Sequence, residues 1–319
     1  METYFLKQKQ LCVLFAMLVL TSICLTACGS VDSNSKYNKK MSDDELKKAI
    51  VECNKNSEII QNGEYIKVEQ KIGAEGEREC EVTTGPDGYF AMFSNWGDYN
   101  VTSDRVSYGY YSFLSDVKIV RVYDDELWQY NVESRILGDF DEVYRADEEY
   151  LERELKDGKV CIKARYQVNE TDKEALMAYG VDVGREIEYI ESYRELDADT
   201  LRICSLTEAV KYADESEPVV YTNASREYSK ENPCKEKEDK LYNEIFGDKT
   251  HTIKITARVG TEDEKEYEIA AADDVSLDYW IKDSQGEYDV FEDSDCTVPV
   301  RLDENDLIKF ESDKTLFMK

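Results

Sequence analysis

The stretch E-I-E-Y-I-E-S-Y-R-E-L-D-A-D-T-L-R-I-C-S-L, residues 186–206, decides the fold more than any other part of the chain. Aromatic and β-branched residues recur through Glu186–Leu196 and Thr200–Leu206, and the acidic turn Asp197–Asp199 separates the two runs. Such residues favour strands, and a short polar turn between two strands favours antiparallel pairing. The stretch therefore predicts a β-hairpin.

Further runs rich in Tyr and β-branched residues predict strands throughout the first two thirds of the chain. They are short and separated by turn-forming residues, and Gly85–Gly88 (G-P-D-G) is the strongest turn signal among them. The predicted strands are Tyr65–Ile72, Glu79–Thr84, Tyr89–Phe93, Val101–Tyr111, Val117–Tyr123, Leu127–Val132 and Val160–Val168. We therefore expect an antiparallel meander that leads into the hairpin.

A capping box at Ser42–Glu45 predicts the start of an N-terminal helix, because its two side chains satisfy otherwise unpaired backbone donors. Apolar residues then recur at helical spacing as far as Ile60, and Asn62–Gly63 predicts the helix end. Two more short helices are expected at Asp147–Lys156 and Thr171–Tyr179. The N-terminal helix should bury its apolar stripe against a core.

The composition changes after residue 225. Residues 226–250 are mostly charged, which predicts a linker or a solvated helix, and residues 251–319 open with a strand-like alternation. We therefore expect an α+β, β-dominated fold in two domains. Residues 42–225 would form an antiparallel sheet with a packed N-terminal helix and short helical insertions, and residues 251–319 a small all-β domain.

The order of these elements, together with Tyr193-x-x-x-Asp197-x-x-Thr200, resembles the half-barrel lipoprotein-carrier and lipoprotein-binding superfamily over Ser42–Ser225. In that superfamily a curved sheet and its helices enclose an apolar cavity for acyl chains or other amphipathic ligands. The resemblance therefore implies a half-barrel-like sheet with a ligand cleft. It transfers no ligand-binding residue to this chain.

The N-terminus has the three parts of an export signal: basic Lys7 and Lys9, the apolar run Leu11–Leu25, and small residues before a cysteine. The motif Leu25-Thr26-Ala27-Cys28, followed by Gly29, resembles the bacterial lipobox. The resemblance implies that residues 1–27 are removed and that Cys28 carries a diacylglycerol; an ordinary signal with an incidental cysteine is the alternative. Residues 28–41 would be a flexible tether, and the body would face the extracytoplasmic side of the cell membrane.

The chain contains 70 acidic and 40 basic residues, which gives a formal net charge of −30. A field of this sign repels phosphate backbones, so we expect no nucleic-acid partner. The lone histidine, His251, argues against most histidine-based catalytic and metal sites. No cofactor motif is present in the sequence, so no cofactor is expected.

The acidic turns Asp197–Asp199 and Asp293–Asp295 each have a Glu at the twelfth loop position, as calcium-binding EF-hand loops do. Arg202 and Val298 occupy the sixth position, where that loop requires glycine, so hairpin turns are the preferred interpretation. No catalytic or metal site is predicted. Apart from Cys28, six cysteines follow the signal and could form disulfides, although free thiols are favoured: Cys53, Cys80, Cys161, Cys204, Cys234 and Cys296.

Aromatic residues are dense between residues 89 and 130. Core packing, an amphiphile cavity and a glycan-stacking surface all fit this composition. The candidate lining residues of an apolar cleft are Tyr89, Phe93, Trp96, Trp128 and Tyr130. We expect a protein that binds a lipid or amphipathic ligand without catalysis; a surface sensor or adhesion module for a glycan or a partner protein, and a carboxylate-based hydrolase, are the alternatives.

Overall fold

The computed structural model describes residues 36–73, 78–103, 105–112, 117–122, 148–247, 251–257, 259–262, 264–272, 274–278, 282–283, 286–287, 290–302, 307–309 and 311–319. Their contacts divide the chain into two compact units. Unit 1 comprises Met1–Pro86 and Ser134–Asn232, and unit 2 comprises Asp87–Glu133 and Pro233–Lys319. These boundaries differ from the domains predicted at residues 42–225 and 251–319.

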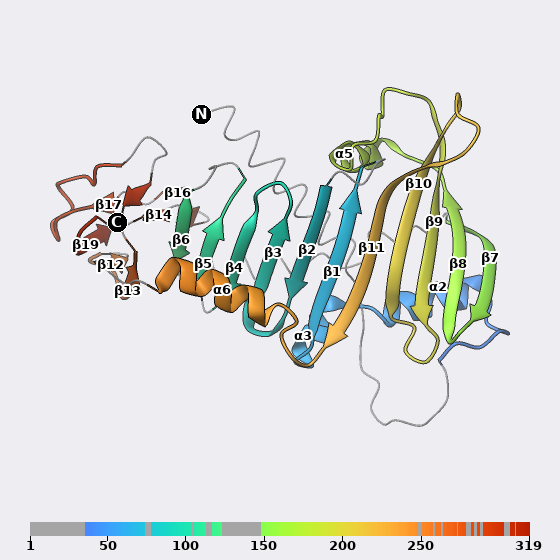
Figure 1. The fold of residues 1–319 in the computed structure, drawn as a ribbon, viewed down its shortest axis with the longest axis horizontal. Coiled ribbons are helices and arrows are strands. Elements are labelled where there is room, and N and C mark those ends of the chain that lie inside the picture. Colours follow the sequence, from blue (N-terminus) through green and yellow to red (C-terminus); the bar gives the residue numbers. More distant parts are fainter. Residues whose placement is uncertain are drawn as a thin grey trace. The chain divides into compact units, whose positions relative to one another are not determined.

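Unit 1 is built on an antiparallel sheet whose strand order is β2-β1-β11-β10-β9-β8-β7 (Figure 1). The strands are β1 (Tyr65–Ile72), β2 (Arg78–Thr84), β7 (Glu149–Lys156), β8 (Lys159–Tyr166), β9 (Ile187–Asp197), β10 (Ile203–Tyr212) and β11 (Val219–Ser229). The hairpin predicted from residues 186–206 is β9 and β10, which pair from Ile203↔Leu196 onward. The sheet is open, and it is not a closed barrel.

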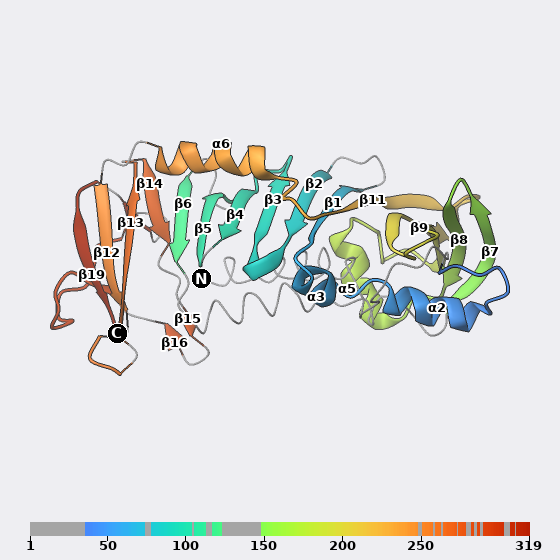
Figure 2. The ribbon, with the colours of Figure 1, turned by 90° about the horizontal axis from the view of Figure 1, so that it is seen from below.

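Three helices, α2 (Asp43–Glu52), α3 (Asn56–Gln61) and α5 (Glu170–Ala178), lie on one side of this sheet (Figure 2). We call the side that they cover the inner face. Leu46 and Ile50 of α2 are fully buried against a cluster that includes Ile162 of β8 and Leu196 of β9. α3 packs in the same way against β1 and β11, through a second apolar cluster that contains Ile59. Burial of these apolar side chains holds the helices on the sheet.

The predicted capping box at Ser42–Glu45 is confirmed. The prediction of a single helix is wrong, however, because the helix is interrupted between Glu52, where α2 ends, and Asn56, where α3 begins. Asn54 lies at the break, where its Nδ2 donates to the carbonyl of Leu201 (2.8 Å) and its Oδ1 accepts from the amide of Ile203 (2.8 Å). These bonds to a distant strand hold Asn54 outside a helical conformation, and they have no signature in the local sequence.

The helix predicted at Asp147–Lys156 is also wrong: residues 149–156 form the edge strand β7, which pairs with β8. Its Glu, Leu and Lys residues favour helices when no partner is considered. Pairing with β8 overrides that preference. The helix predicted at Thr171–Tyr179 is confirmed as α5.

Unit 2 contains a mixed sheet of order β3-β4-β5-β6-β14-β18 and a second sheet of order β13-β12-β19-β17. The first is formed by β3 (Phe90–Ser94), β4 (Tyr99–Ser103), β5 (Val106–Tyr110), β6 (Lys118–Val122), β14 (Val275–Asp278) and β18 (Ile308–Lys309). The second is formed by β12 (His251–Ala257), β13 (Lys265–Ala271), β17 (Val290–Phe291) and β19 (Lys314–Met318). A short pair, β15 (Lys282–Asp283) and β16 (Gly286–Glu287), completes the described strands.

The pairing of β6 with β14 explains why part of the meander belongs to unit 2. The two strands are parallel, with Lys118 opposite Val275. Residues 226–250, predicted to be a linker or a solvated helix, contain the end of β11 and helix α6 (Lys235–Phe246), which buries Leu241 and Ile245. The few apolar residues of this charged segment are therefore sufficient to pack α6 against its neighbours.

The predicted β-dominated α+β class is confirmed. Within the described residues, no helix is both long enough and apolar enough to span a bilayer. The six cysteines of the described residues form no disulfide, and Cys53, Cys80 and Cys234 among them are buried. Disulfides therefore do not constrain the fold of the part of the chain that the structure describes.

Candidate functional site

A row of polar side chains crosses the inner face of unit 1. Ser192 of β9 lies opposite Glu208 of β10, which lies opposite Thr222 of β11. Gln70 of β1 donates from Nε2 to the Thr222 hydroxyl (2.9 Å). Ser192, Thr222 and Gln70 are all buried. Polar groups therefore occupy positions where strand alternation would place apolar side chains.

Glu208 is the titratable centre of this row. The register of β10 against β11 shifts between Glu208 and Ala209, and this irregularity lies beside Tyr221, which is buried like Thr222. The Tyr221 hydroxyl donates to Glu208 Oε2 (2.9 Å), and the Tyr166 hydroxyl donates to Oε1 (3.3 Å). Burial raises the pKa of the Glu208 carboxyl, and the hydrogen bonds and the nearby Arg194 only partly oppose that rise. A partly buried acid with a perturbed pKa marks a candidate binding site.

This raised pKa predicts a pH-dependent stability. Because folded Glu208 holds its proton more tightly than the unfolded chain does, the free energy of unfolding should fall as the pH rises from the ordinary glutamate pKa through the raised one. Glu208→Gln should remove this contribution to the pH dependence, so the free energy of unfolding of the variant should fall less as the pH rises. Urea unfolding between pH 4 and pH 8 measures it. The exposed Glu227→Gln is the control, and an unchanged slope in Glu208→Gln would contradict the prediction.

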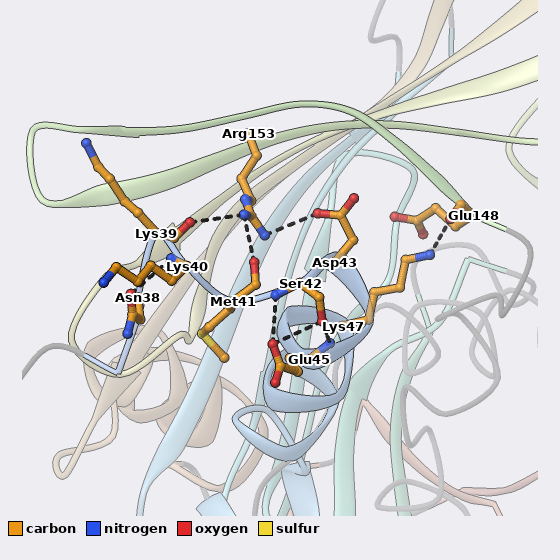
Figure 3. Close-up of polar contacts among 10 residues, drawn as sticks. All are labelled: Asn38, Lys39, Lys40, Met41, Ser42, Asp43, Glu45, Lys47, Glu148 and Arg153. Atoms are coloured by element: carbon orange, nitrogen blue, oxygen red, sulfur yellow. Dashed lines mark hydrogen bonds and ion pairs between the residues drawn. The ribbon is translucent and has the colours of Figure 1, made fainter.

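A buried ion pair lies next to this carboxyl. Arg194 donates from Nη1 and Nη2 to the two carboxylate oxygens of Glu148 (2.7 and 2.9 Å), and both side chains are almost completely buried. Lys47 of α2 donates to the backbone carbonyl of Glu148, as Figure 3 shows. The pair therefore joins β9 to the start of β7 and to α2.

Residues 36–41 lie against this end of unit 1. The amides of Lys36 and Tyr37 donate to the carbonyls of Asp199 and Ala198 (3.3 and 3.1 Å), and Tyr37 is buried. Arg153 of β7 donates to the Met41 carbonyl (2.8 Å) and to the Asp43 carboxylate (3.1 Å) (Figure 3). The tether predicted at residues 28–41 is therefore attached to the sheet from Lys36 onward, which shortens the part that can be free.

Two more inner-face residues carry buried polar atoms without a hydrogen-bond partner in the described part of the chain. These atoms are Nδ2 and Oδ1 of Asn56, at the start of α3, and Nε and Nη2 of Arg226, on β11. Ser192 Oγ is a further such atom. Buried polar atoms are nearly always hydrogen-bonded, so these groups indicate where a polar partner would bind.

The residues predicted to line an apolar cleft belong to unit 2 and not to the inner face of unit 1. Tyr89 and Phe93 are buried beneath α6, where the Tyr89 hydroxyl donates to Glu238 (3.4 Å) and the Lys237 ammonium lies 5.1 Å from the Phe93 ring centroid. Trp96 donates from Nε1 to Asp98 (2.6 Å). The structure thus gives Tyr89 and Phe93 a packing role between strand and helix. Trp128 and Tyr130, and the lipobox residues Leu25, Thr26, Ala27, Cys28 and Gly29, lie outside the described residues.

Unit 2 contains a small cavity of about 10 Å³. Its lining is apolar apart from Asp278, whose carboxylate accepts from Arg121. The lining residues are Val122, Ile255, Leu277, Asp278, Val290, Ile308, Leu316 and Met318. A cavity of this size holds about one water molecule and is too small for an acyl chain.

The two acidic segments that were compared with calcium-binding loops form turns, which was the preferred interpretation of the sequence. Asp197 Oδ1 accepts from the amide and the hydroxyl of Thr200 (2.8 and 2.7 Å). Asp293 accepts from the amides of Thr297 and Val298 (2.9 and 2.6 Å). Their carboxylates thus hold the turns closed.

The sequence interpretation considered Glu208 only as the twelfth position of the calcium-like loop that starts at Asp197, and it did not identify Arg226. A signal was present, because Arg226 stands between exposed Ser225 and Glu227 at the position where the strand alternation requires a buried side chain. Comparison with known proteins adds no further guide: no protein-family model matches the chain, and no curated protein matches it significantly. The assignment of function therefore depends on the geometry and on the N-terminal motif.

Proposed function

We propose that this protein is a membrane-anchored extracytoplasmic lipoprotein that binds an apolar or amphipathic ligand without catalysing a reaction. One observation carries the ligand-binding part: the helix-covered inner face of unit 1 combines apolar clusters with buried polar atoms that have no partner there. An amphipathic molecule offers both kinds of contact. The ligand would lie between the sheet and its helices.

The anchor would be a diacylglycerol on Cys28, supported by the motif Leu25-Thr26-Ala27-Cys28. Only residues 29–35 separate Cys28 from Lys36, which is bonded to the β9–β10 turn. At about 3.3–3.6 Å per residue, the eight steps from Cys28 to Lys36 span at most about 29 Å. The turn at Ala198–Asp199 would therefore be held close to the membrane surface.

Cys28→Ala should abolish incorporation of a fatty-acid analogue into the protein, because the thiol that receives the lipid is lost. Metabolic labelling followed by gel fluorescence measures this. Cys53→Ala is the matched control, since Cys53 is a buried thiol at the C-terminal end of α2, and it should label as the wild type does. Label that persists in Cys28→Ala would refute the anchor.

Ligand binding is tested by extracting the purified protein with organic solvent and identifying bound lipids by mass spectrometry, and by titration with a fluorescent amphiphile. We expect saturable binding at a stoichiometry of about one per chain. Absence of both signals would refute the proposal. Binding to a glycan array without lipid uptake would establish the alternative, a surface adhesion module.

A further inference from the structure

Arg226 is a buried cation on the inner face of unit 1. It is 6 % exposed and lies opposite the buried Val68 of β1. Ala224, two residues earlier on the same face of β11, packs against α3. The arginine head group is therefore enclosed by the sheet and by the helices that cover it.

Its guanidinium is only partly satisfied. Nη1 donates to the Tyr228 hydroxyl (3.3 Å), whereas Nε and Nη2 are buried without a hydrogen-bond partner among the described residues. No carboxylate of the described residues forms an ion pair with Arg226. Burying a charge without a counter-charge is costly, and in a chain with 70 acidic residues a carboxylate could readily have evolved there.

Two other arginines show what such a group binds in this protein. Arg194 holds the Glu148 carboxylate with two nitrogens (2.7 and 2.9 Å). Arg121 uses Nε and Nη2 together to hold the Asp278 carboxylate. Nε and Nη2 form one edge of the guanidinium plane, and this edge matches two oxygens of a carboxylate or phosphate. The free edge of Arg226 is the same edge.

Asn56 adds a neutral donor in the same region. The Tyr228 hydroxyl, which accepts from Arg226, donates to the Ile203 carbonyl (3.1 Å) and lies 3.4 Å from Oδ1 of Asn54, two residues before Asn56. Asn56 is fully buried, and its Nδ2 has no partner among the described residues. Around these groups the cluster is apolar, with Ile59, Ile60 and Val68.

We infer that Arg226 binds the oxyanion head group, carboxylate or phosphate, of an amphipathic ligand whose apolar part lies against the α3 cluster. Nε and Nη2 supply a paired donor set, and the Asn56 amide supplies a further hydrogen bond. The inference rests on the proposed function and gives its ligand a charge. In a strongly acidic protein, this one cation would select anionic amphiphiles over neutral ones.

The test compares three dansyl-labelled amphiphiles with the same alkyl chain and a carboxylate, a phosphate or a hydroxyl head group. Each is titrated by fluorescence into the purified full-length protein. Wild type should bind the anionic probes about ten to a hundred times more tightly than the alcohol, the effect of a hydrogen bond to a charged group. The stronger of the two anionic probes identifies the head group.

Arg226→Met should lose this preference while keeping its affinity for the alcohol. The same variant should unfold at a temperature no lower than the wild type, because it removes an uncompensated buried charge. Arg226→Lys keeps the charge but not the paired donors, and should retain part of the preference. Arg202→Met is the matched control: Arg202 lies 4.8 Å from the same Tyr228 ring but is paired with Glu64 (2.6 Å), and its loss should leave the preference intact.

Equal binding of the anionic and neutral probes by wild type would overturn the inference and leave the proposed function standing. A preference that survives in Arg226→Met would also overturn it. Failure of all three probes to bind would refute the proposed function and the inference together. If Arg226→Met folds normally and loses the preference for anionic probes while Arg202→Met keeps it, the result supports both the inference and the proposed function.

Discussion

Glu148→Ala should lower the free energy of unfolding by about 3–5 kcal/mol, because it leaves the Arg194 guanidinium buried without its partner. The side chains of Arg194 and Glu148 are 2 % and 0 % exposed respectively, so water cannot replace the lost carboxylate without local opening. The variant should destabilise the packing of β7, β9 and α2, because the ion pair joins β7 to β9 and Lys47 of α2 donates to the Glu148 carbonyl. Urea denaturation followed by circular dichroism measures it.

Two variants show whether burial causes this effect. Glu79→Ala breaks the exposed pair with Lys71 and should cost less than about 1 kcal/mol. The double variant Glu148→Leu with Arg194→Met removes both charges and should regain most of the stability lost in Glu148→Ala. If Glu148→Ala proved as mild as Glu79→Ala, the ion pair would be hydrated in solution rather than buried.

Leu46→Ala should cost about 2–5 kcal/mol, since Leu46 is fully buried between α2 and the inner face. The cavity left behind would loosen α2, so amides of this helix should also exchange hydrogen faster than those of β10. Chemical denaturation and hydrogen-exchange mass spectrometry measure the two effects. Leu155→Ala is the control with the same chemistry: Leu155 is 42 % exposed on the edge strand β7 and should lose less than about 1 kcal/mol. Similar losses in the two variants would mean that α2 is not docked as described.

Local features were predictable wherever short-range chemistry decides the conformation. The strand Tyr65–Ile72 was predicted with its observed bounds, and the capping box at Ser42–Glu45 and the acidic turn at Asp197–Asp199 were correct. β7 was predicted as a helix because only its partner β8 reveals it as a strand. The split between α2 and α3 escaped prediction for a similar reason, since Asn54 is held by Leu201 and Ile203 of a distant part of the chain.

The candidate site was largely invisible in the sequence. Among 70 acidic residues, nothing local separates Glu208, which is partly buried and bonded to Tyr221, from the exposed Glu227. The aromatic residues Tyr89 and Phe93, chosen for their density, pack beneath α6. Burial distinguishes these cases, and burial depends on which elements meet.

The sequence by itself determined the strand alternation, the turns and helix caps, the β-dominated class and the lipobox resemblance at Cys28, because each depends on residues within a few positions of one another. Only the tertiary structure decided that β6 pairs with β14, where Arg121 meets Asp278 across 157 residues, and that Arg226 is enclosed without a counter-charge. Contacts between distant segments depend on the packing of the whole unit, and no local pattern specifies them.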